Sequence, residues 1–113
     1  MADLLQGTLD LLVLKTLALE PMHGWGIAQR LEQLSRGVFL VPQGSLYPAL
    51  VRLKRRGMVT SSWRITEAGR RARYYALTVA GHRQLERDRA LWQRTSSAVN
   101  WVLEARHAGG GAA

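Results

Sequence analysis

The chain has 113 residues, of which 47% are hydrophobic, and a formal net charge of +8. This length accommodates one domain, and the apolar content is sufficient for a core, which excludes disorder throughout the chain. The absence of cysteine excludes disulfides, thiolate metal sites and thiol nucleophiles. Residues 1–5 lack the features of a signal peptide, and the apolar stretch over residues 4–19 is too short to span a bilayer. We therefore expect a soluble, cytoplasmic protein without membrane contact.

The positive charge is concentrated in one part of the chain. Between Arg52 and Arg73 there are eight basic residues and one acidic residue, whereas the rest of the chain has eight basic and seven acidic residues. Seven of the eight are arginine, which forms forked hydrogen bonds with phosphate and guanine. A surface that only maintains solubility would intersperse the two signs. The block therefore indicates a polyanionic partner, and we favour nucleic acid.

Two helices are predicted in the first third of the chain. Residues 7–19 are apolar on nearly every face, so this helix must be covered on more than one side. In so small a protein, one of these sides is expected to pack on a partner subunit. A turn over residues 21–24 leads to a second helix over residues 24–34. The buried stripe of the second helix is expected to consist of Ile27, Leu31 and Leu34.

The third predicted helix has two different sides. Ser45 is expected to cap its N-terminus, Pro48 to lie in its first turn, and Gly57 to end it. The inward side consists of Leu46, Leu50 and Leu53. The outward side consists of Gly44, Pro48, Val51, Arg52 and Arg55. This helix therefore combines an apolar back with a basic front.

A β-hairpin is predicted after the third helix. Residues 58–63 have the β-branched and aromatic content of a strand, residues 67–71 form a charged turn, and residues 74–77 form the returning strand. Tyr74 and Tyr75 alternate along this strand, so one of them faces the core. Trp63 is expected to pack at the base of the hairpin, and the alternative is that its ring serves as a stacking platform.

The last predicted helix covers residues 79–106, and Thr78 is expected to cap it. Apolar residues recur along it every seven positions, at Leu85, Trp92 and Val99, and Val102 and Leu103 extend this stripe. Two polar residues, Asp88 and Thr95, interrupt this heptad pattern. Residues 107–113 are rich in glycine and are expected to form a flexible tail.

Helices, hairpin and long helix follow one another in the order of a winged helix-turn-helix, a mainly α fold with a small β-hairpin wing. Residues 1–77 would form the DNA-binding region, and residues 78–106 a dimerisation helix of the same domain. A helix with a polar, basic front enters the major groove with its N-terminal residues at the base edges. Arginines of a wing reach phosphates or the minor groove.

The expected DNA contacts follow from this geometry. Base contacts are predicted for Gln43 and Ser45 at the start of the third helix. Phosphate or minor-groove contacts are predicted for Arg52, Arg55, Arg70, Arg71 and Arg73. Tyr47 has two interpretations, as a core residue with its hydroxyl at the surface or as a phosphate contact.

The sequence contains no pattern typical of a catalytic site. The three histidines, at positions 23, 82 and 107, are far apart and lack the spacing of metal ligands. No nucleophile elbow and no phosphate-binding glycine motif is present. We therefore expect neither enzymatic activity nor a cofactor or metal. The competing function is a winged-helix module that contacts proteins or RNA through nonspecific polyanion binding.

Three segments resemble the PadR family of bacterial transcriptional regulators. Residues 44–50 (GSLYPAL), with the following Arg-Leu and Gly-Met-Val, resemble the recognition helix of that family. Residues 74–81 (YYALTVAG) are similar to the end of its wing and the entry to its last helix. Residues 23–27 (HGWGI) resemble its His-Gly-Tyr opening of the second helix, with Trp25 in place of tyrosine. The resemblance covers about residues 4–105, and the length is that of the subfamily with a single C-terminal helix.

The resemblance implies a homodimer held by the first and last helices, which usually represses transcription from an inverted-repeat operator in double-stranded DNA. The residues expected at the dimer interface are Leu9, Leu12, Leu85, Trp92, Val99 and Val102. In some relatives a tryptophan of the last helix stacks flat aromatic compounds at this interface, and Trp92 occupies the matching place. Its heptad neighbours favour a dimer-core role for Trp92, and binding of a small aromatic effector is the alternative.

Overall fold

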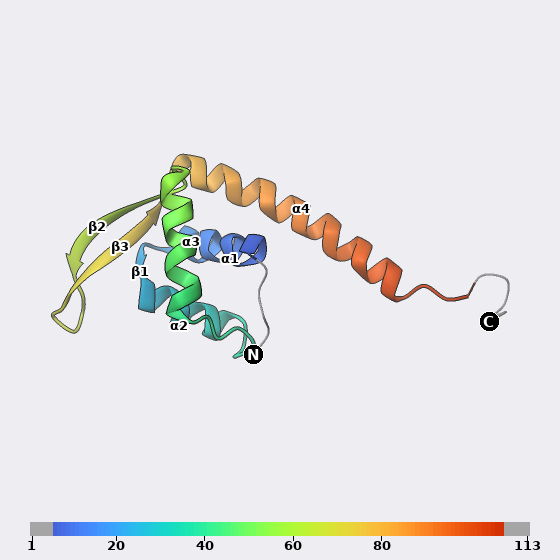
Figure 1. Ribbon diagram of the computed structural model, residues 1–113, viewed down its shortest axis with the longest axis horizontal. Coiled ribbons are helices and arrows are strands. Elements are labelled where there is room, and N and C mark those ends of the chain that lie inside the picture. Colours follow the sequence, from blue (N-terminus) through green and yellow to red (C-terminus); the bar gives the residue numbers. More distant parts are fainter. Residues whose placement is uncertain (1–5, 108–113) are drawn as a thin grey trace.

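The secondary structure of the protein follows the predicted order of helices and strands (Figure 1). The computed structural model describes residues 6–107, so the expectations for residues 1–5 and for the tail beyond residue 107 lie outside it. The elements are α1 (Gln6–Leu19), β1 (Met22–His23), α2 (Gly24–Leu34), α3 (Gln43–Arg55), β2 (Val59–Ile65), β3 (Arg71–Leu77) and α4 (Val79–Leu103). The mainly α fold with a hairpin wing is confirmed. None of the helices among residues 6–107 has the length and apolarity needed to cross a membrane.

Helix α1 is the centre of the core. Val13 and Leu14 are completely buried, and Leu9 and Leu17 are nearly so. These side chains are covered because α1 packs against α2, α3, β3 and α4. The prediction that this helix is covered on more than one side is confirmed. The rest of the core is supplied mainly by Ile27 and Leu31 of α2 and by Leu46, Ala49, Leu50 and Leu53 of α3.

Helix α2 begins at Gly24 because the preceding histidine caps it. The backbone N–H of Gly26 donates to Nδ1 of His23 at 3.0 Å, which satisfies one of the free N–H groups of the first turn. The sequence analysis did not assign this cap. It was also wrong about Leu34, which is 56% exposed, so the buried stripe of α2 ends at Leu31.

The three strands form one antiparallel sheet in the order β1-β3-β2. Strand β1 was predicted as a turn, but its two residues pair with Tyr75 and Tyr74 of β3. The wing, defined here as β2, β3 and their connection, is longer than predicted because pairing continues to Ile65 and Arg71. Its tip closes through a hydrogen bond from the N–H of Thr66 to the carbonyl of Arg70, at 2.7 Å.

The start of α4 is fixed to the end of α3 by one threonine. The hydroxyl of Thr78 accepts from the N–H of Gly81 at 3.0 Å, which confirms the predicted cap, and donates to the carbonyl of Gly57 at 2.6 Å. Gly57 has a φ of +73°, as expected of a residue that ends a helix. A Cβ at Gly81 would collide with the carbonyl of Met58. We define Gly57, Met58, Thr78 and Gly81 as the α3–α4 junction.

Helix α4 packs on the domain only with its first part. Leu85 is buried and belongs to the core, whereas most residues beyond position 89 are exposed. Figure 1 shows the rest of the helix extending away from the other elements, and the molecule has extents of 66 × 28 × 21 Å. The helix ends at Leu103, three residues before the predicted end.

Candidate nucleic-acid interface

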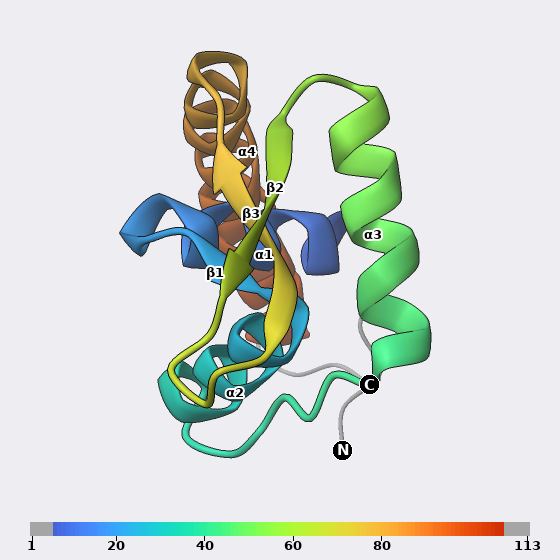
Figure 2. The same cartoon turned by 90° about the vertical axis from the view of Figure 1, so that its left-hand side faces the viewer.

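Helix α3 lies along one side of the molecule, with the wing beside it (Figure 2). Its inward side is buried completely, as predicted, and includes Ala49 in addition to the three leucines. The outward side is exposed at Gly44, Ser45, Pro48, Val51 and Arg55. The helix is thus anchored by its apolar back, and an exposed face that carries Ser45 and Arg55 remains for a partner.

The N-terminus of α3 differs from the prediction in two respects. Pro42, not Ser45, is the N-cap residue, and its carbonyl accepts from the N–H groups of Ser45 and Leu46 at 3.0 Å each. Since the helix begins at Gln43, Pro48 lies in its second turn. The missing N–H of Pro48 removes the bond that the Gly44 carbonyl would otherwise accept.

The earlier start of α3 changes the position of the two predicted base contacts. Gln43 and Ser45 both lie within the first helical turn, and Ser45 is exposed. Neither side chain makes a hydrogen bond within the described residues, because the cap needs no serine hydroxyl. Their polar groups therefore remain available to a partner at the end of the helix that a major groove would receive first.

Tyr47 lies between α3 and the start of α2. A Cβ added to Gly24 would come within 3.1 Å of the Tyr47 hydroxyl oxygen, so the ring packs against the backbone there. The side chain is also half exposed. Tyr47 therefore packs against the start of α2 and is also half exposed to solvent. It also lies close enough to Tyr75 to contribute, after burial, to raising the pKa of that phenol.

Arg52 is the one predicted DNA contact that has an acidic partner among residues 6–107. Its Nη2 donates to Oδ1 of Asp10 in α1 at 2.9 Å. Arg55 is exposed one turn further along and makes no ion pair within the same part of the chain. The two arginines of α3 that were predicted together therefore have different surroundings.

The wing carries arginines on both of its faces. Arg71 and Arg73 share a face with Trp63, and their guanidinium carbons lie 4.8 and 5.2 Å from the centre of its ring. Arg73 also donates from Nε to the hydroxyl of Ser61 at 3.1 Å. On the opposite face, Arg64 lies 5.3 Å from the ring centre of Tyr74.

Two aromatic predictions for the wing can be compared with this arrangement. Tyr75 packs against the core while Tyr74 lies on the other face, so the alternation is confirmed. The prediction for Trp63 was wrong, because its side chain is 53% exposed and contacts arginines instead of the core. The cross-strand pairing of Trp63 with Arg73 would have indicated this contact, had the register of the hairpin been known.

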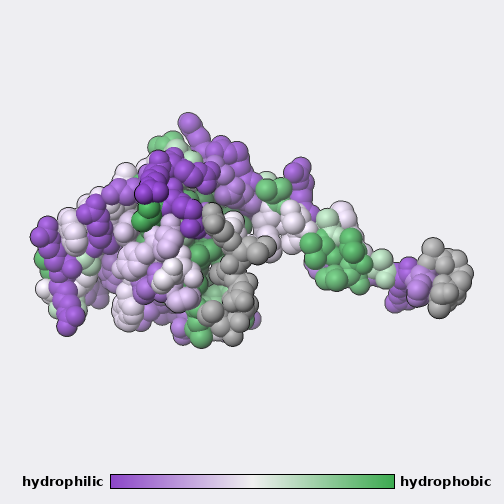
Figure 3. Space-filling view, in the orientation of Figure 1, coloured by the Kyte–Doolittle hydropathy of each residue, from purple (hydrophilic) through white to green (hydrophobic). Residues whose placement is uncertain are grey.

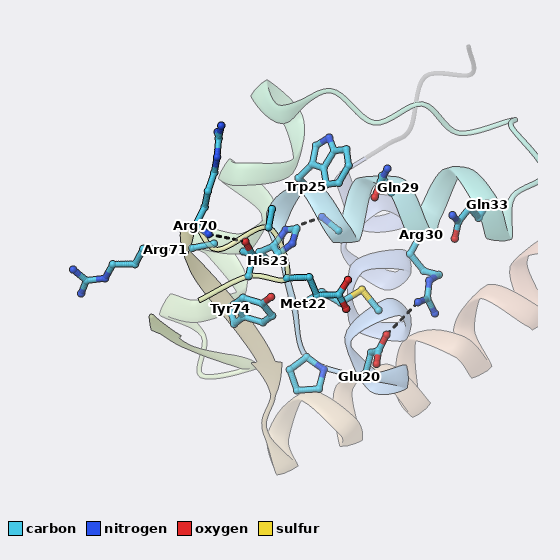
Figure 4. A pocket seen from close by; sticks show the side chains of 16 residues that line it. Glu20, Met22, His23, Trp25, Gln29, Arg30, Gln33, Arg70, Arg71 and Tyr74 are labelled. Atoms are coloured by element: carbon cyan, nitrogen blue, oxygen red, sulfur yellow. Dashed lines mark hydrogen bonds and ion pairs between the residues drawn. The ribbon is translucent and has the colours of Figure 1, made fainter. Parts of the chain in front are cut away.

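A groove of about 930 Å³ separates α2 from the tip of the wing (Figure 4). Its aromatic lining comes from Trp25, His23 and Tyr74, and the ring of His23 meets Tyr74 edge-on at 5.3 Å. Arg30 on its wall is paired with Glu20 at 3.1 Å. In Figure 4 the side chains of Arg70 and Arg71 extend away from the groove. These two cations are therefore presented outward at the wing tip.

The exposed part of α4 carries an apolar surface. Figure 3 shows hydrophobic side chains gathered on the projecting end of the helix. The large apolar residues exposed there are Leu91, Trp92, Val99, Trp101, Val102 and Leu103. Leu91, Trp101 and Leu103 were not among the predicted interface residues. Contiguous exposed apolar patches are typical of interaction sites on soluble proteins.

Two of the residues predicted for the dimer interface lie inside the chain itself. Leu9 and Leu85 belong to the core cluster, and Leu12 is partly buried against it. Trp92, Val99 and Val102 are half exposed or more. The single chain therefore leaves the C-terminal part of the predicted stripe uncovered. No group of side chains among residues 6–107 is arranged to hold a metal ion.

Comparison with known proteins gives a consistent result. The family described as transcriptional regulator PadR-like matches residues 13–87, which is more than half of the chain. Transcriptional regulator Rv3488 of Mycobacterium tuberculosis is 40% identical over 68 residues, which cover 60% of this chain and 60% of that protein.

Solved structures are similar over most of the chain. A PadR-like transcriptional regulator from Bacillus cereus has a TM-score of 0.79 and 27% identity, with coverage of 93% of this chain and 100% of that chain. A PadR family transcriptional regulator from Eggerthella lenta has a TM-score of 0.76 and 30% identity, with coverage of 89% and 86%.

Proposed function

This chain belongs to the PadR-like family of transcriptional regulators, and we propose that it represses transcription as a homodimer bound to an inverted-repeat operator. The observation that carries the proposal is the exposed face of α3 beside an arginine-bearing wing (Figure 2). A rigid helix whose first turn offers free polar groups is suited to base edges in a major groove. Flanking arginines are suited to the phosphates on either side.

Each part of this surface has a proposed contact. Gln43 and Ser45, in the first turn of α3, contact base edges. Arg55, Arg70, Arg71 and Arg73 contact phosphates or the minor groove, where they fix the position of the protein without selecting a sequence. Tyr47, which is half exposed beside the start of α2, contacts the DNA backbone between them.

The exposed apolar surface of α4 supports the dimer. A second copy of the chain would cover Trp92, Val99 and Val102, which one chain leaves uncovered. A two-fold symmetric dimer presents two recognition helices to two half-sites, so its operator is expected to be an inverted repeat. In this dimer Trp92 packs in the interface, beside the stripe that begins with the buried Leu85.

The decisive experiment is selection of bound DNA from a random duplex library. We expect an inverted repeat to be enriched, and to bind about 10³-fold or more tightly than random duplex at physiological salt. Gln43→Ala should alter the enriched bases, whereas Arg71→Ala should weaken binding to all sequences similarly. Enrichment of no motif, with equal binding to RNA and acidic protein, would instead favour a nonspecific interaction module.

The role of Trp92 is tested separately. Planar aromatic compounds are titrated against wild type and against Trp92→Phe, and tryptophan emission and operator release are followed together. We expect neither quenching specific to Trp92 nor release of DNA, because the Trp92 side chain is buried in the core of the proposed dimer. Saturable quenching that Trp92→Phe removes, accompanied by DNA release, would assign Trp92 to an effector site.

A further inference from the structure

Arg52 is held by a carboxylate from a distant part of the chain. Its Nη2 and the Oδ1 of Asp10 are 2.9 Å apart, across 42 positions of sequence, and they connect α3 to α1. The Asp10 side chain is 12% exposed and that of Arg52 is 31% exposed. Nε of Arg52 is buried without a hydrogen-bond partner. The guanidinium of Arg52 is therefore held against the protein through Nη2 and the buried Nε, while about a third of the side chain remains exposed.

The position of the pair matters because α1 packs against both α3 and α4. Helix α3 carries the proposed base contacts, and α4 carries the apolar surface proposed to hold the dimer. The orientation of the recognition helix relative to the partner subunit therefore depends on how α3 sits on α1. The apolar back of α3 resists separation from α1, but apolar contacts are non-directional. A charged hydrogen bond adds the directional constraint.

We propose that the Asp10–Arg52 ion pair positions α3 on α1 and thereby sets the separation of half-sites that the dimer accepts. This inference rests on the proposed function. Two half-sites on one side of B-DNA are about 34 Å, or one helical turn, apart. Moving one half-site by a single base pair shifts it by about 3.4 Å and rotates it around the duplex. A dimer whose two α3 helices are held in fixed directions binds operators with one half-site separation. It binds operators with a shorter or longer separation more weakly.

The competing explanation is that Arg52 leaves Asp10 and contacts a phosphate. The two explanations differ in the salt dependence of binding. Loss of a phosphate contact lowers the slope of log affinity against log salt by about 1 per contact. Loss of a positioning residue leaves the number of phosphate contacts unchanged and alters which operators are accepted.

The experiment compares Arg52→Gln and Asp10→Asn with Arg55→Gln, the matched control from the exposed side of the same helix. Each full-length variant is first shown to be folded and dimeric by circular dichroism and light scattering. Affinity is then measured by fluorescence anisotropy at several salt concentrations. The duplexes are the selected operator and versions with half-sites one or two base pairs closer or further apart.

Arg52→Gln and Asp10→Asn should each reduce the preference for the native separation by about fivefold or more, with an unchanged salt slope. Arg55→Gln should lower the salt slope and keep the preference for separation. A salt slope lowered by Arg52→Gln as much as by Arg55→Gln overturns the proposal. The proposal is also overturned if Arg52→Gln and Asp10→Asn both prefer the native half-site separation as strongly as wild type does.

A second variant keeps the test valid if removal of one charge prevents folding. Asp10→Leu combined with Arg52→Met replaces the ion pair by apolar side chains, so that no uncompensated charge remains between α1 and α3. This double variant should bind the operator with a broadened separation preference, and an unaltered preference would contradict the proposal. A wild-type protein that selects no inverted repeat would instead overturn the proposed function itself.

Discussion

At the scale of single residues, the arginines of the wing differ from ordinary surface cations. Arg71 and Arg73 both lie over the ring of Trp63. A guanidinium over an aromatic face is attracted to it while its N–H groups remain free for hydrogen bonds at its edge. Side chains held this way lose less rotamer entropy when a polyanion binds. The two arginines are therefore preorganised for the phosphate contacts that we propose for them.

This arrangement predicts an effect of Trp63→Leu on DNA binding. Each exposed cation–π contact is worth about 0.5–1 kcal/mol, so loss of both should weaken operator binding by about three- to tenfold. The number of phosphate contacts stays the same, and so should the slope of affinity against salt. Anisotropy titrations check this, with Ile65→Ala on the same face as control. Equal affinities of Trp63→Leu and wild type would show that the ring does not preorganise the arginines.

Tyr75 gives a second prediction at this scale. Burial raises the pKa of its phenol above the ordinary value of 10.0, with a smaller contribution from Tyr47, while Arg73 lowers it. Because the pKa is higher in the folded than in the unfolded state, the stabilisation is present below pH 10 and is lost as pH rises through the raised value. Tyr75→Phe should therefore lose less stability above pH 10 than wild type. Urea unfolding at a series of alkaline pH values measures this, and parallel curves would refute it.

At the scale of the elements, the α3–α4 junction determines how the wing and α4 are placed relative to the recognition helix. Thr78 binds the backbone at both ends of the junction, through Gly57 and Gly81. Gly81 allows α4 to approach the carbonyl of Met58 more closely than any other residue would permit. Position 81 requires glycine because of its contact with the Met58 carbonyl, whereas Gly44 in α3 has open space around it.

These two helical glycines should respond to alanine in opposite directions. Gly81→Ala forces the backbone of the junction apart and should lower the free energy of unfolding by about 1–3 kcal/mol. Gly44→Ala meets no neighbouring atom and should raise it by about 0.5–1 kcal/mol through helix propensity. Chemical denaturation of both variants tests the contrast. A Gly81→Ala protein as stable as wild type would mean that α4 can move away at no cost.

Local sequence patterns were sufficient to predict the long elements. The apolar faces of α1 and α3, the threonine cap of α4 and the glycine at the end of α3 depend on neighbours within a few positions. The start of α3 was misplaced because Pro42 and Ser45 are both acceptable before a helix, and the leucines face inward with either start. Strand β1 has only two residues, too few for a periodic pattern.

The candidate site was predictable in its outline but not in its pairings. The charge block predicted where the candidate interface lies, since charges can be counted along the sequence without knowledge of the fold. The partner of Arg52 lies 42 positions away, and the two partners of Trp63 lie 8 and 10 positions away. These contacts could not be predicted, because they depend on how the elements pack. The burial of Leu9 and Leu85 within one chain could not be predicted for the same reason. An apolar stripe does not reveal whether it faces its own core or a partner.

At the scale of the whole molecule, the projecting part of α4 has an apolar surface that a single chain does not cover. Val102 is 74% exposed, and the apolar residues around it have no cover within residues 6–107. The buried core belongs to the other elements and to the start of α4. Association and folding of the domain should therefore be separable, because a substitution near the end of α4 leaves the core unchanged.

Val102→Glu should accordingly yield a folded monomer at micromolar concentration. A carboxylate at this position would be buried without a partner in the proposed dimer, which costs several kcal/mol. Asn100→Glu adds the same charge to an exposed position of the same helix and should remain dimeric. Sedimentation equilibrium measures the masses of both, and near-ultraviolet circular dichroism reports the core. Identical dimer masses for both variants would place the subunit interface elsewhere.

The projecting end of α4 also affects how long the protein survives in a cell. Without a partner, this end has few packed side chains, and short isolated helices are marginally stable in water. Segments that open locally in this way are preferred substrates of proteases. Under the proposed dimerisation, orphan subunits would be degraded faster than paired ones. The steady-state level of the protein would then depend on the association constant of its dimer as well as on its rate of synthesis.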